Sequence, residues 1–184
     1  EWEKNFNTWL TTDDINKVMK QYEVDDKSLK YIGAVPMDFA ECEFKNELCN
    51  FNLNKYLNDG KTKIAIVFNT DDHDESGEHW ISMYIDCKGV NMRKPCIYFF
   101  DSVGEKEPEE IAEFVEKIKE QGEKNGIVFT YFWNNIPHQS GSTECGIYCL
   151  HFLTYMTEGG NFKNYITNKK SDEYMEKFRN IFFV

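Results

Sequence analysis

The chain lacks the features that would place it in a membrane, in a secretory pathway or on a nucleic acid. No run of residues approaches the ~18 uncharged apolar positions of a membrane span, and no signal sequence opens the chain. Positive charge is also scarce, because 21 Lys and Arg are set against 32 Asp and Glu, for a net charge of −11. Such a surface repels phosphate backbones and anionic lipids, so we expect no nucleic-acid and no membrane partner.

A C-x-x-C pair is also missing, although the chain contains six cysteines. Structural zinc sites usually show that spacing, and a chain of 184 residues can bury a core without disulfides. We therefore expect no metal, no cofactor and a reducing compartment in which most thiols are small buried side chains. The cysteines are Cys42, Cys49, Cys87, Cys96, Cys145 and Cys149.

No internal repeat, low-complexity tract or Pro/Gly/Ser-rich linker divides the chain. Hydrophobic residues make up 41% of it and aromatic residues 16%, which is the composition of a folded domain. We expect residues 1–184 to form one domain and to be a monomer. The chain begins at Glu1 rather than at methionine, which leaves room for a preceding N-terminal segment.

The spacing of apolar residues predicts an α+β fold, a central mixed sheet flanked by helices. Helical periodicity or helix-start signals occur at residues 12–22, 51–57, 108–122, 144–156 and 173–182. Pro108 is expected to open the third of these helices, where its missing N–H costs nothing. Apolar runs typical of strands occur at residues 63–69, 80–87, 96–101 and 127–133.

Cys145 stands where a polar loop meets a strongly apolar helix, and we predict that it is a nucleophile. In the first turn of a helix a thiol lies near free N–H groups and the positive end of the helix dipole, which favour the thiolate. Gly146 would let a substrate backbone approach closely. Cys149 lies one turn further on, inside the apolar segment, and is expected to be a core residue.

His79 and Asp101 are the candidates for a base and for the group that orients it. His79 begins a predicted strand directly after an acidic turn, so its ring can stand at the sheet edge. Asp101 ends a neighbouring apolar strand, where its carboxylate can accept a ring N–H and fix the tautomer. A structural role is the simpler interpretation of either residue alone. His138 remains a rival base.

Gln139 is the candidate oxyanion donor. Its side-chain amide could donate to the developing negative charge together with the backbone N–H of Cys145. A glutamine in a loop means little alone, so the interpretation depends on the order of the group. That order is His79-Trp80, Asp101-Ser102, Gln139 and Cys145-Gly146.

This order resembles the adenain-like and SUMO-protease superfamily of cysteine peptidases, and the resemblance covers almost the whole chain. Within it, the chain is most similar to the polyprotein-processing proteases of large DNA viruses, of the African swine fever virus and poxvirus type. The residues that carry this likeness are Phe68-Asn69-Thr70-Asp71, His138-Gln139, Thr143-Glu144-Cys145-Gly146 and the C-terminal segment 172–182.

The resemblance implies cleavage after a Gly-Gly pair in a protein substrate, which a narrow aromatic tunnel would select because glycine has no side chain. Trp9, followed by Leu10 and Asp13, and Trp80 match the positions that enclose the Gly-Gly tail in SUMO proteases. Core packing is the structural alternative for both tryptophans. The implied location is the host cytoplasm and the virion for a viral enzyme, or otherwise the cytoplasm or nucleus.

Other functions stay open at this point. A deconjugating protease for SUMO, ubiquitin or a relative would use the same chemistry but would need a docking surface for a folded modifier. An inactive domain that only binds tails would have lost part of the triad. A metal hydrolase built on His73, His79 and the acids at positions 71–75 would crowd its ligands into one solvated loop.

Overall fold

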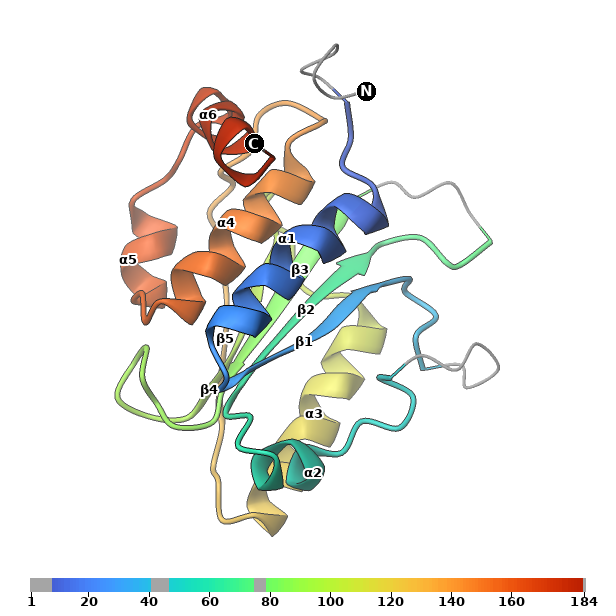
Figure 1. The fold of residues 1–184 in the computed structure, drawn as a ribbon, viewed down its shortest axis with the longest axis vertical. Coiled ribbons are helices and arrows are strands. Elements are labelled where there is room, and N and C mark those ends of the chain that lie inside the picture. The colour runs from blue at the N-terminus through green and yellow to red at the C-terminus, as the bar shows by residue number, and fades with distance from the viewer. Residues whose placement is uncertain (1–7, 41–46, 75–78, 184) are drawn as a thin grey trace.

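The computed structural model describes residues 8–40, 47–74 and 79–183, which form a mixed sheet between two layers of helices. Figure 1 shows helices α1, α4, α5 and α6 on one side of the sheet and α2 and α3 on the other. The predicted α+β class with a central mixed sheet and flanking helices is confirmed. Within the described residues, no helix is long and apolar enough to cross a bilayer.

The sheet has five strands in the order β1-β2-β3-β4-β5. Its two inner pairs, β2 with β3 and β3 with β4, are antiparallel, whereas β1 and β5 are added in parallel at the edges. The strands are β1 (Leu29–Val35), β2 (Lys63–Asn69), β3 (Trp80–Asp86), β4 (Cys96–Phe100) and β5 (Thr130–Trp133). The three inner strands were predicted, β5 is shorter than expected, and β1 was missed.

Six helices surround this sheet in the described part of the chain. The first begins with a reciprocal capping box, in which Thr11 accepts from the Asp14 N–H and Asp14 accepts from the Thr11 N–H. The helices are α1 (Thr12–Asp25), α2 (Leu53–Asn58), α3 (Glu109–Lys124), α4 (Cys145–Thr157), α5 (Phe162–Thr167) and α6 (Asp172–Phe182). The short α5 was not predicted, and Pro108 is the N-cap of α3 rather than its first residue.

Two hydrophobic cores lie on opposite faces of the sheet because the side chains of each strand alternate. On β2, Ile64 and Ile66 point into the core under α2 and α3, whereas Ala65 and Val67 point into the core under α1 and α4. The inner strands β3 and β4 are buried throughout, as expected for strands covered on both faces.

Helix α4 is buried all round, except at Tyr155. It packs on β3 with α1 beside it and α6 against it, and its N-terminus brings Cys145 to the same end of the sheet as the start of β3 (Figure 1). A helix that is apolar on every side has no solvated face and must sit in the interior. The apolar sequence of α4 therefore also accounts for the burial of Cys145, its first residue.

The cysteines depart from expectation at one position. Cys87, Cys96, Cys145 and Cys149 are free and buried, as predicted for most of the thiols. Cys49 is disulfide-bonded, so the expectation of reduced cysteines fails there. Spacing alone does not show which loop cysteines approach one another. Cys42 and the end of the acidic turn, residues 75–78, lie outside the described residues.

Candidate active site

Cys145 is the first residue of α4, as the sequence predicted. The preceding residue, Glu144, is the N-cap, and its carboxylate accepts hydrogen bonds from the backbone N–H and hydroxyl of Thr143. Because Cys145 lies in the first turn of α4, its thiol is at the helix end where unpaired N–H groups and the helix dipole favour negative charge. The Cys145 side chain is almost completely buried.

His79 and Asp101 are brought together by the pairing of β3 with β4. The two strands are antiparallel with Ser82 opposite Phe100, so His79, just before β3, and Asp101, just after β4, are diagonal neighbours at one end of the sheet. The His79 Nε2 atom lies 2.7 Å from Asp101 Oδ1. The same carboxylate oxygen also accepts the backbone N–H of Val103 at 3.0 Å. This contact holds the carboxylate in place for the ring.

The pKa of His79 is raised from 6.5 to about 10. Burial works against the charged ring, but hydrogen bonds to Asp101 and Cys145, and the charges of both partners, outweigh it. Because Nε2 is occupied by Asp101, Nδ1 is the ring nitrogen that reaches the thiol. The structure thus joins the three predicted residues in one chain of contacts and favours the protonated ring at neutral pH.

Gln139 lies beside these residues with its amide oriented by two partners. Its Oε1 accepts the hydroxyl of Ser102 at 2.6 Å, and its Nε2 donates to the carbonyl of Gly141 at 3.1 Å. The backbone N–H of Gln139 also donates to the Ser102 carbonyl at 2.9 Å. One N–H of the amide is used by Gly141, so the second is available for a ligand.

Two further residues, Ser102 and Asn134, support this site. The sequence predicted no role for either, although Ser102 stands beside Asp101 in the motif. Ser102 orients the Gln139 amide. Asn134 is completely buried and holds the backbone of Asp101, accepting from its N–H at 2.9 Å and donating to its carbonyl at 2.8 Å. Because β5 runs parallel to β4, the residues that follow the two strands lie at the same end of the sheet. An asparagine directly after β5 could therefore have been predicted to lie near Asp101.

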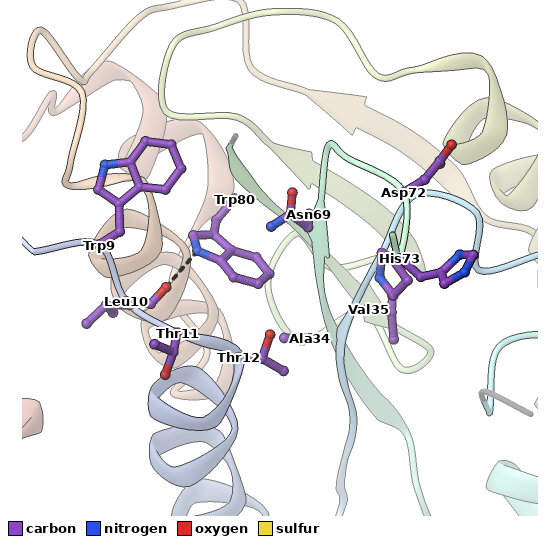
Figure 2. Close-up of a pocket in the computed structure, with 11 residues that line it drawn as sticks. Trp9, Leu10, Thr11, Thr12, Ala34, Val35, Asn69, Asp72, His73 and Trp80 are labelled. Carbon is purple, nitrogen blue, oxygen red and sulfur yellow. Dashed lines mark hydrogen bonds between the residues drawn. The ribbon is translucent and has the colours of Figure 1, made fainter. Parts of the chain in front are cut away.

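A cavity of about 510 Å³ opens beside this group. Figure 2 shows Trp9 and Trp80 at one end of it and Asp72 and His73 at the other. Trp80 is buried and donates its indole N–H to the Leu10 carbonyl at 3.0 Å, whereas Trp9 is 37% exposed. Trp80 therefore belongs to both the core and the cavity wall, whereas Trp9 is a partly solvent-exposed side of the cavity.

The cavity does not include the thiol, the imidazole or the Asp101 carboxylate, but it lies next to them. Trp80 follows His79 in the chain, and Leu10 packs against Gly146. A β-carbon on Gly146 would lie 3.0 Å from the Leu10 side chain, so the glycine is needed for the packing of Leu10 against α4. A role in substrate approach stays a prediction.

The alternative histidines are engaged in other contacts. The His138 ring is buried, stacks on Tyr165 and contacts the Ile166 carbonyl through Nε2 at 3.1 Å. His73 forms an ion pair with Asp38. Within the described residues, no group of three or more His, Cys, Asp and Glu side chains could hold a metal ion.

Residues 39–183 match the Ulp1 protease family, C-terminal catalytic domain, and the chain belongs to this family. It is 34% identical over 95% of its length to protein R355 of Acanthamoeba polyphaga mimivirus, which is named as a thiol protease. It is 30% identical over its full length to the SUMO-1 cysteine protease S273R of an African swine fever virus isolate. It spans 56% and 62% of these two relatives.

Solved structures share the fold at lower identity. The crystal structure of the African swine fever virus pS273R protease has a TM-score of 0.84 at 23% identity, over 97% of this chain and 68% of that one. The Ulp1 protease domain in complex with SMT3, the yeast ortholog of SUMO, has a TM-score of 0.63 at 15% identity, over 96% of this chain and 75% of that one.

Proposed function

We propose that the chain is a cysteine endopeptidase in which Cys145 is the nucleophile, His79 the general base, Asp101 the residue that orients the base and Gln139 an oxyanion donor. The contact that supports this proposal best is the 2.7 Å hydrogen bond between His79 Nε2 and Asp101 Oδ1. It leaves the other ring nitrogen for the thiol at the start of α4, which is the arrangement that nucleophilic catalysis requires.

The reaction follows from these positions. The Cys145 thiolate attacks the scissile carbonyl carbon, and the carbonyl π electrons move onto the oxygen. Gln139 Nε2–H and the Cys145 backbone N–H donate to this oxyanion. His79, protonated at Nδ1, gives its proton to the leaving amine as the C–N bond breaks. Water, deprotonated by His79, then attacks the thioester, and the acid product leaves with the thiol restored.

The proposed substrate is a chain with Gly-Gly before the cleaved bond. The cavity beside the triad is bounded by Trp9 and Trp80, and the indole of Trp80 is fixed by its hydrogen bond to Leu10. A residue without a side chain passes most easily between two large rings. The buried, hydrogen-bonded Trp80 supports this selection better than Trp9, which is partly exposed.

We infer further that the protein processes viral core or structural polyproteins, in the host cytoplasm and the virion, because the mimivirus and African swine fever virus relatives are viral proteins. Deconjugation of SUMO, ubiquitin or a related modifier is the second candidate. It is favoured by the shared fold with a Ulp1 domain that was crystallised with SMT3.

The decisive experiment compares kcat/KM for a Gly-Gly-Xaa peptide with kcat/KM for ubiquitin and SUMO reporters. Faster turnover of the bare peptide supports the polyprotein protease, and a preference of about 100-fold for a folded modifier supports the deconjugase. Cys145→Ala should be inactive. Cys149→Ala, one turn along the same helix, should remain active. Equal activity of Cys145→Ala and wild type would refute the assignment.

A further inference from the structure

The loop of residues 139–144 leads into the proposed nucleophile, and it is held by a carboxylate from another part of the chain. Asp172, the first residue of α6, accepts the backbone N–H of Gly141 at 2.8 Å and that of Ser140 at 3.0 Å through Oδ2. Its Oδ1 also lies 3.4 Å from the Ser140 N–H. Two successive amides that converge on one carboxylate fix the local path of a loop.

The same carboxylate is anchored to the helix that carries Cys145. Asp172 Oδ1 lies 2.9 Å from the hydroxyl of Tyr148, a fully buried side chain on the first turn of α4. That hydroxyl is also 2.9 Å from the Lys170 carbonyl. Asp172 therefore joins the loop and α4 through one side chain, which sets the loop's position relative to the thiol.

The loop in turn holds the proposed oxyanion donor. Gly141 donates its N–H to Asp172, and its carbonyl accepts the side-chain N–H of Gln139. If the Gly141 peptide rotated, the Gln139 amide would lose the partner that directs its remaining N–H.

Helix capping does not explain the placement of Asp172. Ser171 already caps α6, because its hydroxyl accepts the Tyr174 N–H at 3.2 Å. The next acidic residue, Glu173, lies in the same first turn but is exposed, and its carboxylate forms an ion pair with Lys177 at 3.3 Å. The two carboxylates have the same charge and nearly the same position relative to the helix dipole, but only Asp172 reaches the loop.

We propose that Asp172 is a positioning residue for the peptidase: it holds the 139–144 loop so that Gln139 donates to the oxyanion. The proposal rests on the proposed function, and it concerns how the oxyanion donor is placed. A positioning role can be told apart from a purely structural role. If Asp172 positions Gln139, its loss slows only the steps that form an oxyanion, and reactions that use the thiolate alone are unaffected.

The test uses Asp172→Asn and Asp172→Ala, with Glu173→Gln as the matched control. Three quantities are measured on each: kcat and KM for a Gly-Gly-Xaa peptide, the Kd of a Gly-Gly peptide aldehyde, and the rate of alkylation by iodoacetamide. The aldehyde forms a hemithioacetal, in which the Cys145 sulfur bonds to the aldehyde carbon and the oxygen takes the oxyanion position. Iodoacetamide alkylation forms a C–S bond and releases iodide, with no oxyanion.

We expect Asp172→Ala to lower kcat about 10- to 100-fold with little change in KM. A displaced Gln139 amide would stabilise the oxyanion of the transition state less well, but it would not alter the binding of the substrate. The aldehyde Kd should rise by the same factor, and the alkylation rate should stay within about twofold of wild type. Asp172→Asn keeps one acceptor oxygen and should fall between Asp172→Ala and wild type. Glu173→Gln should match wild type in all three measurements.

Circular dichroism melts show the folded fraction at the assay temperature, and rates are expressed per folded molecule. Unchanged kcat and aldehyde affinity in folded Asp172→Asn would overturn the positioning role while leaving the proposed function intact. A parallel loss of alkylation rate would also overturn it, since the effect would then lie on the thiol. If wild type neither cuts the peptide nor binds the aldehyde, the proposed function fails, and this inference fails with it.

Discussion

Acidification should destabilise the fold through His151, a buried histidine on α4. Its side chain is only 7% exposed, and Nδ1 lies 2.8 Å from the Tyr165 hydroxyl. Burial first, and then the charges of Lys170 and His138, lower its pKa from 6.5 to about 4. The ring is therefore neutral in the native state near pH 5, where it would be largely protonated in the unfolded chain. The groups around it are Tyr165, Tyr174, Phe178, Lys170 and His138.

The sign and size of the effect follow from proton binding. Between pH 6.5 and about 4 the unfolded state binds one more proton at His151 than the native state, so stability falls as the pH falls through this window. From pH 7 to pH 5 the loss should be about 1 to 2 kcal/mol. The lowered pKa of His138 acts in the same direction. The raised pKa of His79 gives stability that is complete below pH 6.5 and is lost progressively as the pH rises from about 6.5 to 10, so between pH 7 and pH 5 it acts in the opposite direction to His151.

The assay is urea unfolding at pH 7 and pH 5 for wild type and His151→Gln. The variant cannot titrate, so its free energy of unfolding should fall by about 1 to 2 kcal/mol less between the two pH values than that of wild type. The difference between the two proteins removes the contributions of all other groups. Equal pH dependence in both would refute the conclusion that His151 is neutral in the folded protein.

Three further predictions concern the site itself. Asp101→Ala should lower kcat/KM about 100-fold and should move the basic limb of its pH profile to lower pH, because the pKa of His79 falls when its anionic partner is removed; an unmoved limb would mean that another group sets that pKa. Ser102→Ala should reduce kcat/KM about 10-fold, measured on the Gly-Gly peptide, because the Gln139 amide is then free to rotate; wild-type activity would contradict that role. Gly146→Ala should lower the free energy of unfolding in urea by about 1 to 3 kcal/mol, because the added β-carbon would overlap the side chain packed against it; an unchanged midpoint would show that the contact relaxes freely.

The elements that the sequence predicted are those with a strong local signal. The inner strands are continuous apolar runs, and α4 is an apolar segment that starts after a polar loop. Strand β1 was missed because its apolar pattern is interrupted, with Lys30 near its start and Gly33 at an irregularity in its pairing with β2. Helix α5 has six residues, too few for a helical period to show.

The candidate site shows the same division. His79, Asp101, Gln139 and Cys145 could be chosen by residue type and by their place at the ends of elements. Their supporting residues could not, because each acts across the fold. Asn134 contacts Asp101 only through the parallel pairing of β4 and β5. Asp172 reaches its loop from α6, and no spacing along the chain encodes that contact.

The near-complete burial of α4 has a consequence for the order in which parts of the protein unfold. Amide hydrogens of a helix packed on every side should exchange with deuterium only when the whole domain unfolds. The 139–144 loop is held by a few polar contacts, including those to Asp172, and its amides at Ser140 and Gly141 should exchange by local opening. The thiol would then sit on the most protected part of the molecule and its oxyanion donor on one of the less protected parts. Moderate denaturant should therefore abolish turnover while the helix that carries Cys145 is still intact.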